Sequence, residues 1–347
     1  MMMYLLAYSW NIMWLDVVMV LPLVVMGFER LMHTGKYLTY VLSLAYALYA
    51  NYYIGFMLCL FMVIYYVAFL FRSRHTADQN RSSLFRFTVG SLLGGGLAMF
   101  LLVPVYLALG QTSAAGASLP DLNSNFDMFN LLGRHLYEVS PTIRSGNLPN
   151  IYCGVLAVFM LPIFALNSGI PRRRRVAYVG MLTLMGLSLT VNQLNLIWHG
   201  LHAPNDLPYR FSFLYSFVLL LIAYEALLHM ETIRPKQILL SVGGIAAYLM
   251  LEERFGDEAY GFTSIYATLL LVAIYAAISL LIARRRMLPR AGYCLLLLVV
   301  MGEMTFNAGS TFRQMQSNEY FTAHENYVDN DTVRAIRAAV GRTKEIA

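Results

Sequence analysis

The chain has 347 residues, of which 59% are hydrophobic and 13% are charged, and its formal net charge is +6. Soluble domains carry about 25% charged residues, and several apolar runs here reach the roughly 17 residues that cross a bilayer as a helix. The composition therefore excludes a soluble globular domain and predicts an all-α, polytopic membrane protein. The basic residues lie in loops between these runs, so the net charge does not indicate a nucleic-acid partner. The three cysteines lie far apart in apolar segments, which excludes a disulfide framework.

Ten membrane spans are predicted in chain order. They cover residues 11–32, 37–51, 52–71, 87–109, 151–169, 176–197, 211–230, 237–251, 262–283 and 291–308. We interpret residues 1–308 as one membrane domain built from these spans. The polar tail over 309–347 contains a predicted helix over 332–344 and has too little apolar sequence to fold alone. We expect this tail to begin an outer domain that the chain does not complete.

The basic residues predict the orientation of the spans. If the loop 198–210 lies outside, sixteen lysines and arginines fall in inside loops, four in outside loops and five in the tail. Short loops near the membrane carry their excess of basic residues on the cytoplasmic side. This predicts a multi-pass membrane protein with the loop 198–210 and the tail outside. The runs Arg172–Arg175 and Arg284–Arg286 are interpreted as orientation signals that could also bind anionic membrane lipid.

The longest outer loop, 110–150, is predicted to contain an amphipathic helix over 121–138. Apolar residues at helical spacing define one face and polar residues the other: Phe126, Phe129, Leu132 and Leu136 against Asp127, Asn130, Arg134 and Glu138. Such a helix lies in the membrane interface.

The loop Trp198–Arg210 concentrates polar side chains between two apolar spans. They are His199, His202, Asn205, Asp206, Tyr209 and Arg210. An arginine where the chain re-enters the membrane needs an anionic partner. That partner is either a phosphate, which the planar guanidinium binds well, or a structural pair with Asp206 or Asp16. The two histidines suit contacts to a phosphate or sugar, a base, a metal site or packing at the interface.

Two carboxylates lie in the outer parts of predicted spans, Asp16 in the first and Glu303 in the last. Carboxylates within a membrane are costly and often functional, although each could instead be an interhelical hydrogen-bond partner. Glu225, in the inner half of its span, is interpreted as structural. Three more residues at the outer face suit sugar hydroxyls or anchor the interface: Asn51, Asn150 and Tyr152. The convergence of these groups on one face predicts a substrate site there.

Four segments of the chain resemble the YfhO family of bacterial membrane proteins. They are Asn11–Asp16, Asn51–Gly55, Pro149–Gly154 and, most specifically, Trp198–Phe213, and the resemblance runs over most of residues 10–308. YfhO-like proteins resemble glycosyltransferases of the GT-C class, multi-span enzymes that use a lipid-phosphate sugar at the outer membrane face. The resemblance implies a GT-C-like membrane domain in a bacterial cytoplasmic membrane, a polyprenyl-phosphate-sugar donor and an envelope polymer such as lipoteichoic acid as acceptor.

The resemblance also implies roles for residues of the outer face. Arg210, with His199 or His202, would stabilise the charge of the departing phosphate. Sugar or acceptor contacts are expected from Asn150, Tyr152, Asn205 and Tyr209. Enzymes of this class carry an acidic catalytic residue in the first outer loop. This chain begins after that loop, so we expect it to be shortened at both ends, with Asp16 as the substitute base. A divalent cation could assist, although no ligand set in the sequence demands one.

Two other interpretations stay open. A transporter or flippase of a lipid-linked substrate needs polar groups through the membrane thickness and broken helices, and Pro22, Pro104 and Gly94–Gly96 could break helices. The polar groups crowd one face, which favours the enzyme. An assembly subunit without a site would tolerate replacement of Arg210 and of both histidines.

Overall fold

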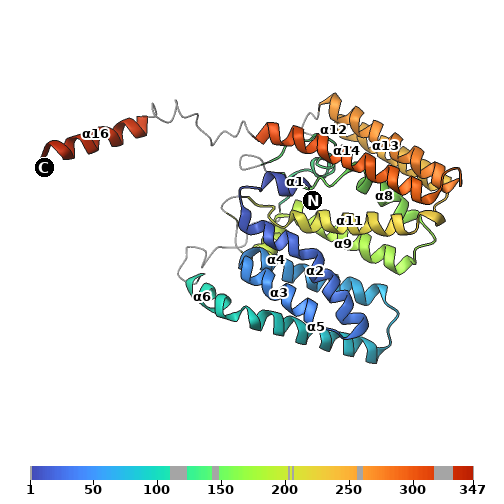
Figure 1. Ribbon diagram of the computed structural model, residues 1–347, viewed down its shortest axis with the longest axis horizontal. Helices are drawn as coiled ribbons and strands as arrows, with labels where there is room; N and C mark the ends of the chain where they lie inside the picture. The colour runs from blue at the N-terminus through green and yellow to red at the C-terminus, as the bar shows by residue number, and fades with distance from the viewer. Residues whose placement is uncertain are drawn as a thin grey trace.

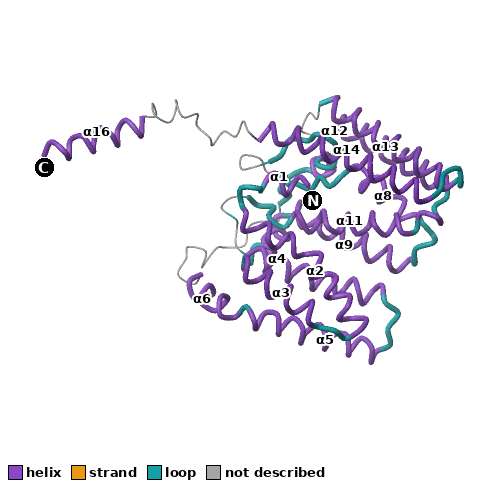
Figure 2. The backbone as a smooth tube through the Cα atoms, viewed as in Figure 1, coloured by secondary structure: helices purple, strands orange, loops and turns teal. Residues whose placement is uncertain are grey.

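The structure is a computed structural model that describes residues 2–109, 123–142, 148–201, 204, 207–255, 261–315 and 331–346. Regular structure within these ranges is helical, apart from an isolated bridge between Ser124 and Val191 (Figure 1, Figure 2). The helices are α1 (Met2–Ala7), α2 (Ile12–Thr34), α3 (Leu38–Ala50), α4 (Tyr52–Arg72), α5 (Ala77–Leu97), α6 (Met99–Leu109), α7 (Met128–Gly133), α8 (Val155–Leu166), α9 (Arg172–Thr190), α10 (Asn192–Trp198), α11 (Ser212–Leu228), η1 (Met230–Thr232), α12 (Pro235–Phe255), α13 (Phe262–Ala283), α14 (Pro289–Met315) and α16 (Asp331–Ile346). The predicted all-α class is confirmed.

Each predicted span coincides with helical sequence, but the helices differ in length. Within the described ranges, four helices are long and apolar enough to cross a membrane, and the bent pair α5 and α6 makes a fifth if it is one span. The helices α3, α8 and α11 are apolar but shorter. The chain is therefore a multi-pass membrane protein, while the number of ten spans stays a prediction.

The predicted span over 87–109 is the one that the structure changes most. Its helix begins at Ala77, and a bend of 76° separates α5 from α6. The bend follows Gly94–Gly96 directly, and each glycine costs roughly 1 kcal/mol relative to alanine inside a helix. The glycine run therefore marks a break, as expected, whereas α2 continues through Pro22.

The helices form two groups, α2 to α6 and α8 to α14, with α4 packed on α9 between them (Figure 1). The pair α2 and α3 approaches closely because Gly27 has no side chain. A Cβ at Gly27 would lie 2.6 Å from the backbone nitrogen of Tyr40. The neighbouring Phe28 is fully buried and makes edge contacts to the rings of Tyr65 and Phe69. Apolar close packing of this kind fixes the first group of helices.

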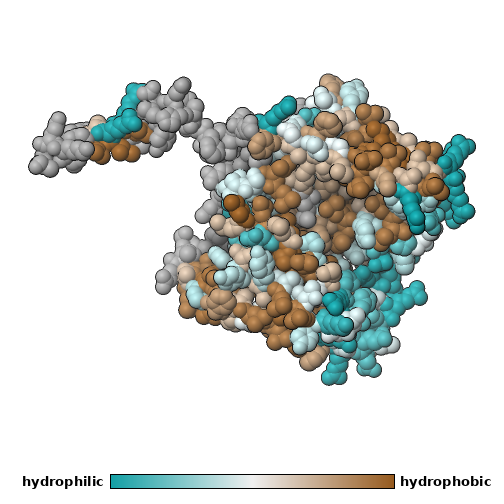
Figure 3. Space-filling model, in the orientation of Figure 1, coloured by the Kyte–Doolittle hydropathy of each residue, from teal (hydrophilic) through white to brown (hydrophobic). Residues whose placement is uncertain are grey.

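The bundle has two chemically different ends. Residues 73–76, 167–171, 229–234 and 284–288 form the loops of what we call the arginine-rich end. Figure 3 shows hydrophilic surface gathered at this end, on the right of the view, and hydrophobic surface along the helices. The opposite end carries residues 123–142, 199–201 and 207–210, and we call it the site end. This separation agrees with the one-sided arrangement of basic residues in the sequence.

Residues 123–142 do not form the interfacial helix predicted over 121–138. Only Met128–Gly133 is helical. The polar side of the pattern is not a solvated face, because Arg134 is only 4% exposed. Glu138 adopts a left-handed φ of 61°, which does not fit a continuous α-helix. The segment packs over the site end instead, so tertiary contacts override the helical periodicity of its sequence.

The predicted domain boundary at residue 308 falls inside a helix. The last apolar helix, α14, continues to Met315, and the helix predicted over 332–344 corresponds to α16, Asp331–Ile346. The assignment of the tail to an outer domain stays a prediction.

Candidate functional site

Arg210 lies at the site end between two aromatic rings from different helices. Its guanidinium carbon is 5.3 Å from the ring centroid of Trp14 and 5.0 Å from that of Tyr53. Trp14 lies in the first turn of α2 and Tyr53 in the first turn of α4, so two helix starts supply the rings. Each cation–π contact contributes roughly 0.5–2 kcal/mol, depending on desolvation. We call these three side chains the Arg210 cradle.

The loop before Arg210 follows a constrained backbone path. Gly200, Leu201 and Leu207 have φ angles of 68°, 64° and 53°. Leucine rarely adopts such values, which cost on the order of 1 kcal/mol or more and persist only where the surroundings enforce them. Trp198 stacks on Phe211 with ring centroids 4.8 Å apart, which ties the two ends of the loop together. Packing at its ends, rather than local preference, therefore sets the position of Arg210.

His199 positions one wall of the cradle. It is 4% exposed, and its Nε2 lies 2.8 Å from the carbonyl oxygen of Pro208, which can only accept. Nε2 therefore carries the proton of the neutral ring, and Nδ1 accepts from the Tyr53 hydroxyl at 2.5 Å. With both nitrogens engaged, His199 holds the Tyr53 ring against Arg210. This geometry favours a positioning role over the base or metal ligand that the sequence left open.

The short helix α1 also contacts the cradle, and the sequence pattern does not predict this helix. Tyr4 is fully buried, and its hydroxyl donates to the backbone carbonyl of Arg210 at 2.8 Å. The ring of Tyr8 packs against Tyr4 and Trp14, at centroid distances of 4.8 and 5.4 Å. The spacing of Tyr4 and Tyr8 is the available signal, but a helix of 6 residues is too short for periodicity to reveal.

Asp16 is half-buried, and it has no hydrogen-bond or ion-pair partner within the described part of the chain. It follows Trp14 by two residues, which is about 200° around an α-helix, so the two side chains lie on different faces of α2. The neighbours of Asp16 on its face include Ile12 and Met19, which are 72% and 74% exposed. Asp16 therefore faces the lipid side of α2, and the pair with Arg210 considered from the sequence is not formed.

Asn150 is fully buried and holds the turn at residues 134–142. Its Oδ1 accepts from Arg134 Nη2 at 3.1 Å and from the Thr142 N–H at 3.0 Å. Its amide nitrogen donates to the Thr142 carbonyl at 2.7 Å, and Arg134 donates to the carbonyl of Pro149 at 3.1 Å. These bonds give Asn150 a structural role and leave its amide little capacity for the predicted sugar contact.

Glu303 and Tyr152, both predicted at the substrate site, contact each other inside the protein. Glu303 is 4% exposed, and its Oε1 accepts from the Tyr152 hydroxyl and from the Val155 N–H, the latter at 2.6 Å. Its Oε2 accepts from the Tyr275 hydroxyl at 2.5 Å. Val155 begins α8, where a negative charge is favourable. Glu303 thus joins α14, α13 and the start of α8, which is the interhelical role that the sequence left open.

Asn51 and Tyr209 have clear local roles. Asn51 caps α4, since its Oδ1 accepts from the N–H groups of Tyr53 and Ile54 at 3.1 and 2.9 Å. Tyr209 packs its ring against Phe126 at a centroid distance of 5.5 Å, and burial raises the pKa of its hydroxyl. The remaining predicted contacts lie outside the described residues: His202, Asn205 and Asp206.

No group of three or more His, Cys, Asp or Glu side chains that could hold a metal ion occurs within the described ranges. The divalent cation stays a prediction.

An apolar cavity of about 260 Å³ next to the turn at 134–142 is lined by His135 and Tyr215, which hydrogen-bond to each other at 3.1 Å. Burial lowers the pKa of His135 to about 4, so its ring is neutral at physiological pH.

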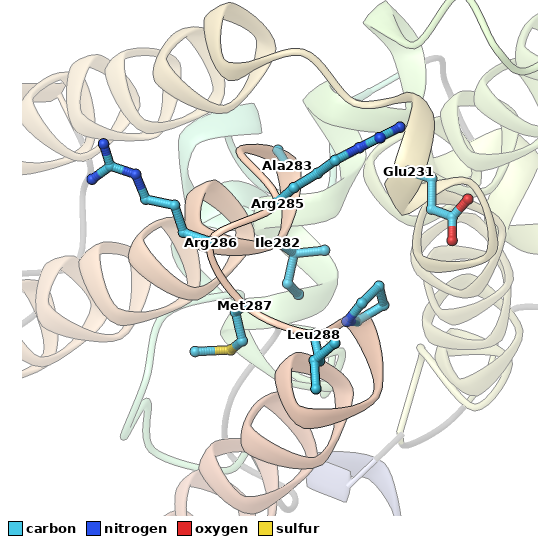
Figure 4. Close-up of a pocket in the computed structure, with 8 residues that line it drawn as sticks. Glu231, Ile282, Ala283, Arg285, Arg286, Met287 and Leu288 are labelled. Atoms are coloured by element: carbon cyan, nitrogen blue, oxygen red, sulfur yellow. The ribbon is translucent and has the colours of Figure 1, made fainter.

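A cavity of about 400 Å³ lies at the arginine-rich end, in the turn between α13 and α14. Figure 4 shows Arg285 and Arg286 extending to opposite sides of this turn. Their guanidinium groups do not converge on a common point, so the turn is not a built anion site. Its place at the end opposite to Arg210 also separates it from the cradle.

Comparison with known proteins identifies a family for the chain. The family model described as bacterial membrane protein YfhO matches residues 1–345. No curated protein and no solved structure matches the chain.

Proposed function

The chain belongs to the YfhO family of bacterial membrane proteins, and we propose that it is a GT-C-like membrane glycosyltransferase. The donor is a polyprenyl-phosphate sugar, and the acceptor is an envelope polymer such as lipoteichoic acid. The reaction takes place at the outer face of a bacterial cytoplasmic membrane, which is the site end of the bundle. Family membership and the Arg210 cradle support this proposal.

The Arg210 cradle carries the proposal. In the reaction, an acceptor hydroxyl forms a bond to the anomeric carbon, the bond from that carbon to the phosphate oxygen breaks, and the lipid phosphate leaves with the electron pair. Negative charge grows on the phosphate, and a preorganised cation stabilises it. Arg210 is half-buried and is held between the rings of Trp14 and Tyr53. Its planar guanidinium group can bind two phosphate oxygens at once.

The acceptor hydroxyl also loses a proton, and Asp16 is our proposed acceptor of that proton. Its carboxylate has no partner within the described residues and lies on the lipid-facing side of α2. A donor carried by a polyprenyl chain approaches from this side. Because Asp16 does not contact Arg210, the donor would have to pass around α2 to reach both residues, and Asp16→Asn tests this part separately.

The test is envelope glycosylation in a strain that lacks the gene, complemented with the full-length gene. Three forms are compared: wild type, Arg210→Ala, and the control Arg254→Ala, which removes an exposed arginine from the end of α12. Mass spectrometry of teichoic acids and other surface polymers measures the sugar. We expect the sugar to be absent in the deletion strain, restored by wild type and by the control, and absent with Arg210→Ala at equal expression.

Two results would contradict the proposal. Polymers unchanged by the deletion would exclude this acceptor class. Full restoration by Arg210→Ala would remove the cradle from the mechanism. Arg210→Lys separates charge from shape, because lysine keeps the charge but lacks the planar fork; partial restoration is the expected result.

A second candidate function, a transporter or flippase of a lipid-linked substrate, is favoured by one observation. Charged side chains lie at both ends of the bundle. Arg210 lies at the site end, and at the arginine-rich end Glu29 contacts Arg72 and Glu225 contacts Arg174. A transporter needs sites that both faces can reach. Vesicles that contain the purified protein and a fluorescent polyprenyl phosphate discriminate the two functions, since only a flippase speeds transfer of the probe between leaflets.

A further inference from the structure

An amphipathic cavity at the arginine-rich end has no part in the proposed sugar transfer. It measures about 410 Å³ and lies between α2, α4, α9 and α11. Its charged wall consists of Glu29, His33, Arg72, Arg174 and Glu225. Its apolar wall includes Pro22, Met26 and Leu221. The lining of this cavity is thus amphipathic. It differs from the lining of the apolar cavity at His135 and from the Arg210 cradle.

Of the two arginine–glutamate pairs in this cavity, the pair of Arg72 and Glu29 has its hydrogen-bonding groups largely engaged, and His33 Nε2 also lies 3.3 Å from Glu29 Oε2. Arg72 contacts Glu29, which also accepts from the Tyr65 hydroxyl at 2.6 Å. Arg72 further donates to the Tyr178 hydroxyl at 3.4 Å and lies over the Phe69 ring at 5.3 Å. These contacts come from α2, α4 and α9, so this pair joins the two groups of helices and leaves little capacity for a ligand.

The other pair, Arg174 and Glu225, has hydrogen-bonding capacity left for a ligand. Arg174 Nη2 lies 2.9 Å from Glu225 Oε1, and the side chain of Arg174 is 34% exposed. Glu225 is 8% exposed, and within the described ranges its Oε2 has no hydrogen-bond partner. His229 Nδ1 is 4.0 Å from that oxygen and bonds instead to the backbone carbonyl of Glu225 at 2.9 Å. A buried carboxylate oxygen without a donor is costly, so this oxygen requires a donor that the described residues do not supply.

The cavity opens toward the bilayer. Met26 and Tyr224, which line it, are 53% and 58% exposed, and exposed apolar side chains on a membrane protein face lipid. The charged wall lies at the arginine-rich end of the helices, and the wall with Pro22 lies closer to the middle of α2. A molecule with a polar head and apolar chains matches this arrangement, with its head at the charges and its chains in the hydrocarbon.

We propose that this cavity binds a phospholipid whose headgroup carries both a phosphate and a primary amine. The ammonium group donates a hydrogen bond to Glu225 Oε2, the phosphate binds Arg174, and the acyl chains lie against Pro22, Met26 and Leu221. Two carboxylates and two guanidinium groups leave the wall close to neutral. A purely anionic headgroup is therefore repelled by Glu225, and a purely cationic headgroup is repelled by Arg174. A zwitterion satisfies both partners. This inference does not depend on the proposed sugar transfer.

Native mass spectrometry of the purified full chain in detergent tests the proposal. The probes are phosphatidylethanolamine, phosphatidylglycerol and phosphatidylcholine of identical acyl chains. Phosphatidylcholine is zwitterionic but its quaternary ammonium cannot donate a hydrogen bond, and phosphatidylglycerol lacks the amine. We expect preferential retention of phosphatidylethanolamine. Glu225→Gln weakens that binding by roughly tenfold, which corresponds to about 1.4 kcal/mol. The control Arg173→Gln removes an exposed neighbouring charge and leaves binding unchanged.

Three outcomes would overturn the proposal. Equal retention of phosphatidylglycerol removes the role of the amine, and equal retention of phosphatidylcholine removes the hydrogen bond to Glu225. Equal phosphatidylethanolamine binding by wild type and Glu225→Gln removes the site. Gel-filtration elution and the melting temperature report whether Glu225→Gln folds. If it does not, Leu221→Trp fills the apolar wall without changing charge and should reduce binding of phosphatidylethanolamine while Arg173→Gln does not.

Discussion

Replacing Glu303 distinguishes a structural hub from a substrate-binding residue. Its carboxylate accepts from the Tyr152 hydroxyl, the Val155 N–H and the Tyr275 hydroxyl, and Tyr152 and Tyr275 are 1% and 0% exposed. Glu303→Ala leaves three buried donors without an acceptor. Each such donor costs about 1–3 kcal/mol, so we expect a loss of at least about 3 kcal/mol. At roughly 2 °C per kcal/mol for a chain of this size, the melting temperature should fall by roughly 6 °C.

The assay is thermal unfolding of the purified protein in detergent, followed by intrinsic fluorescence. Glu303→Gln should lose much less, because its amide oxygen still accepts from Tyr152 and Val155 while its nitrogen donates to the Tyr275 hydroxyl. The matched control, Glu253→Ala, removes an exposed carboxylate from α12 and should stay within about 0.5 kcal/mol of wild type. A Glu303→Ala protein that melts like wild type but no longer restores glycosylation would refute the structural assignment and make Glu303 a substrate contact.

Two further predictions concern pH and helix capping. Burial lowers the pKa of His135 from 6.5 to about 4, so between these values the unfolded chain binds a proton that the folded protein does not. Stability should therefore fall as the pH falls through this window, by about 2 kcal/mol at pH 5. In melting curves at pH 7.5 and 5, His135→Gln should show a smaller difference than wild type, and an equal difference would exclude His135 as the cause. Asn51→Ala removes the two cap bonds of α4 and should cost about 1 kcal/mol. Since Tyr53 lies in the capped turn, this variant should also reduce glycosylation, whereas loss of stability alone would separate the cap from the cradle.

The sequence by itself determines the structural class of this protein and indicates where along the chain its candidate site lies. Continuous apolar runs require helices, because a helix satisfies its backbone hydrogen bonds internally in lipid. The glycine run Gly94–Gly96 predicts the break after α5, and the polar loop before Arg210 is evident between two spans. These features depend on composition and short-range spacing, which the sequence displays directly.

Only the tertiary structure decided which side chains contact one another. The cradle of Arg210 uses a ring from α2, a ring from α4 and the carbonyl contact of Tyr4 from α1, and the bond from Tyr53 to His199 spans 146 residues. Spacing along a chain does not show which helix faces meet, so Asp16 looks close to the site in sequence yet faces lipid. The same limit explains why the sequence suggested a structural role for Glu225 and a place at the substrate site for Glu303. The structure instead engages both oxygens of Glu303 and leaves Glu225 Oε2 without a donor among the described residues. Both are intramembrane carboxylates in the sequence, and only packing assigns each oxygen its neighbours.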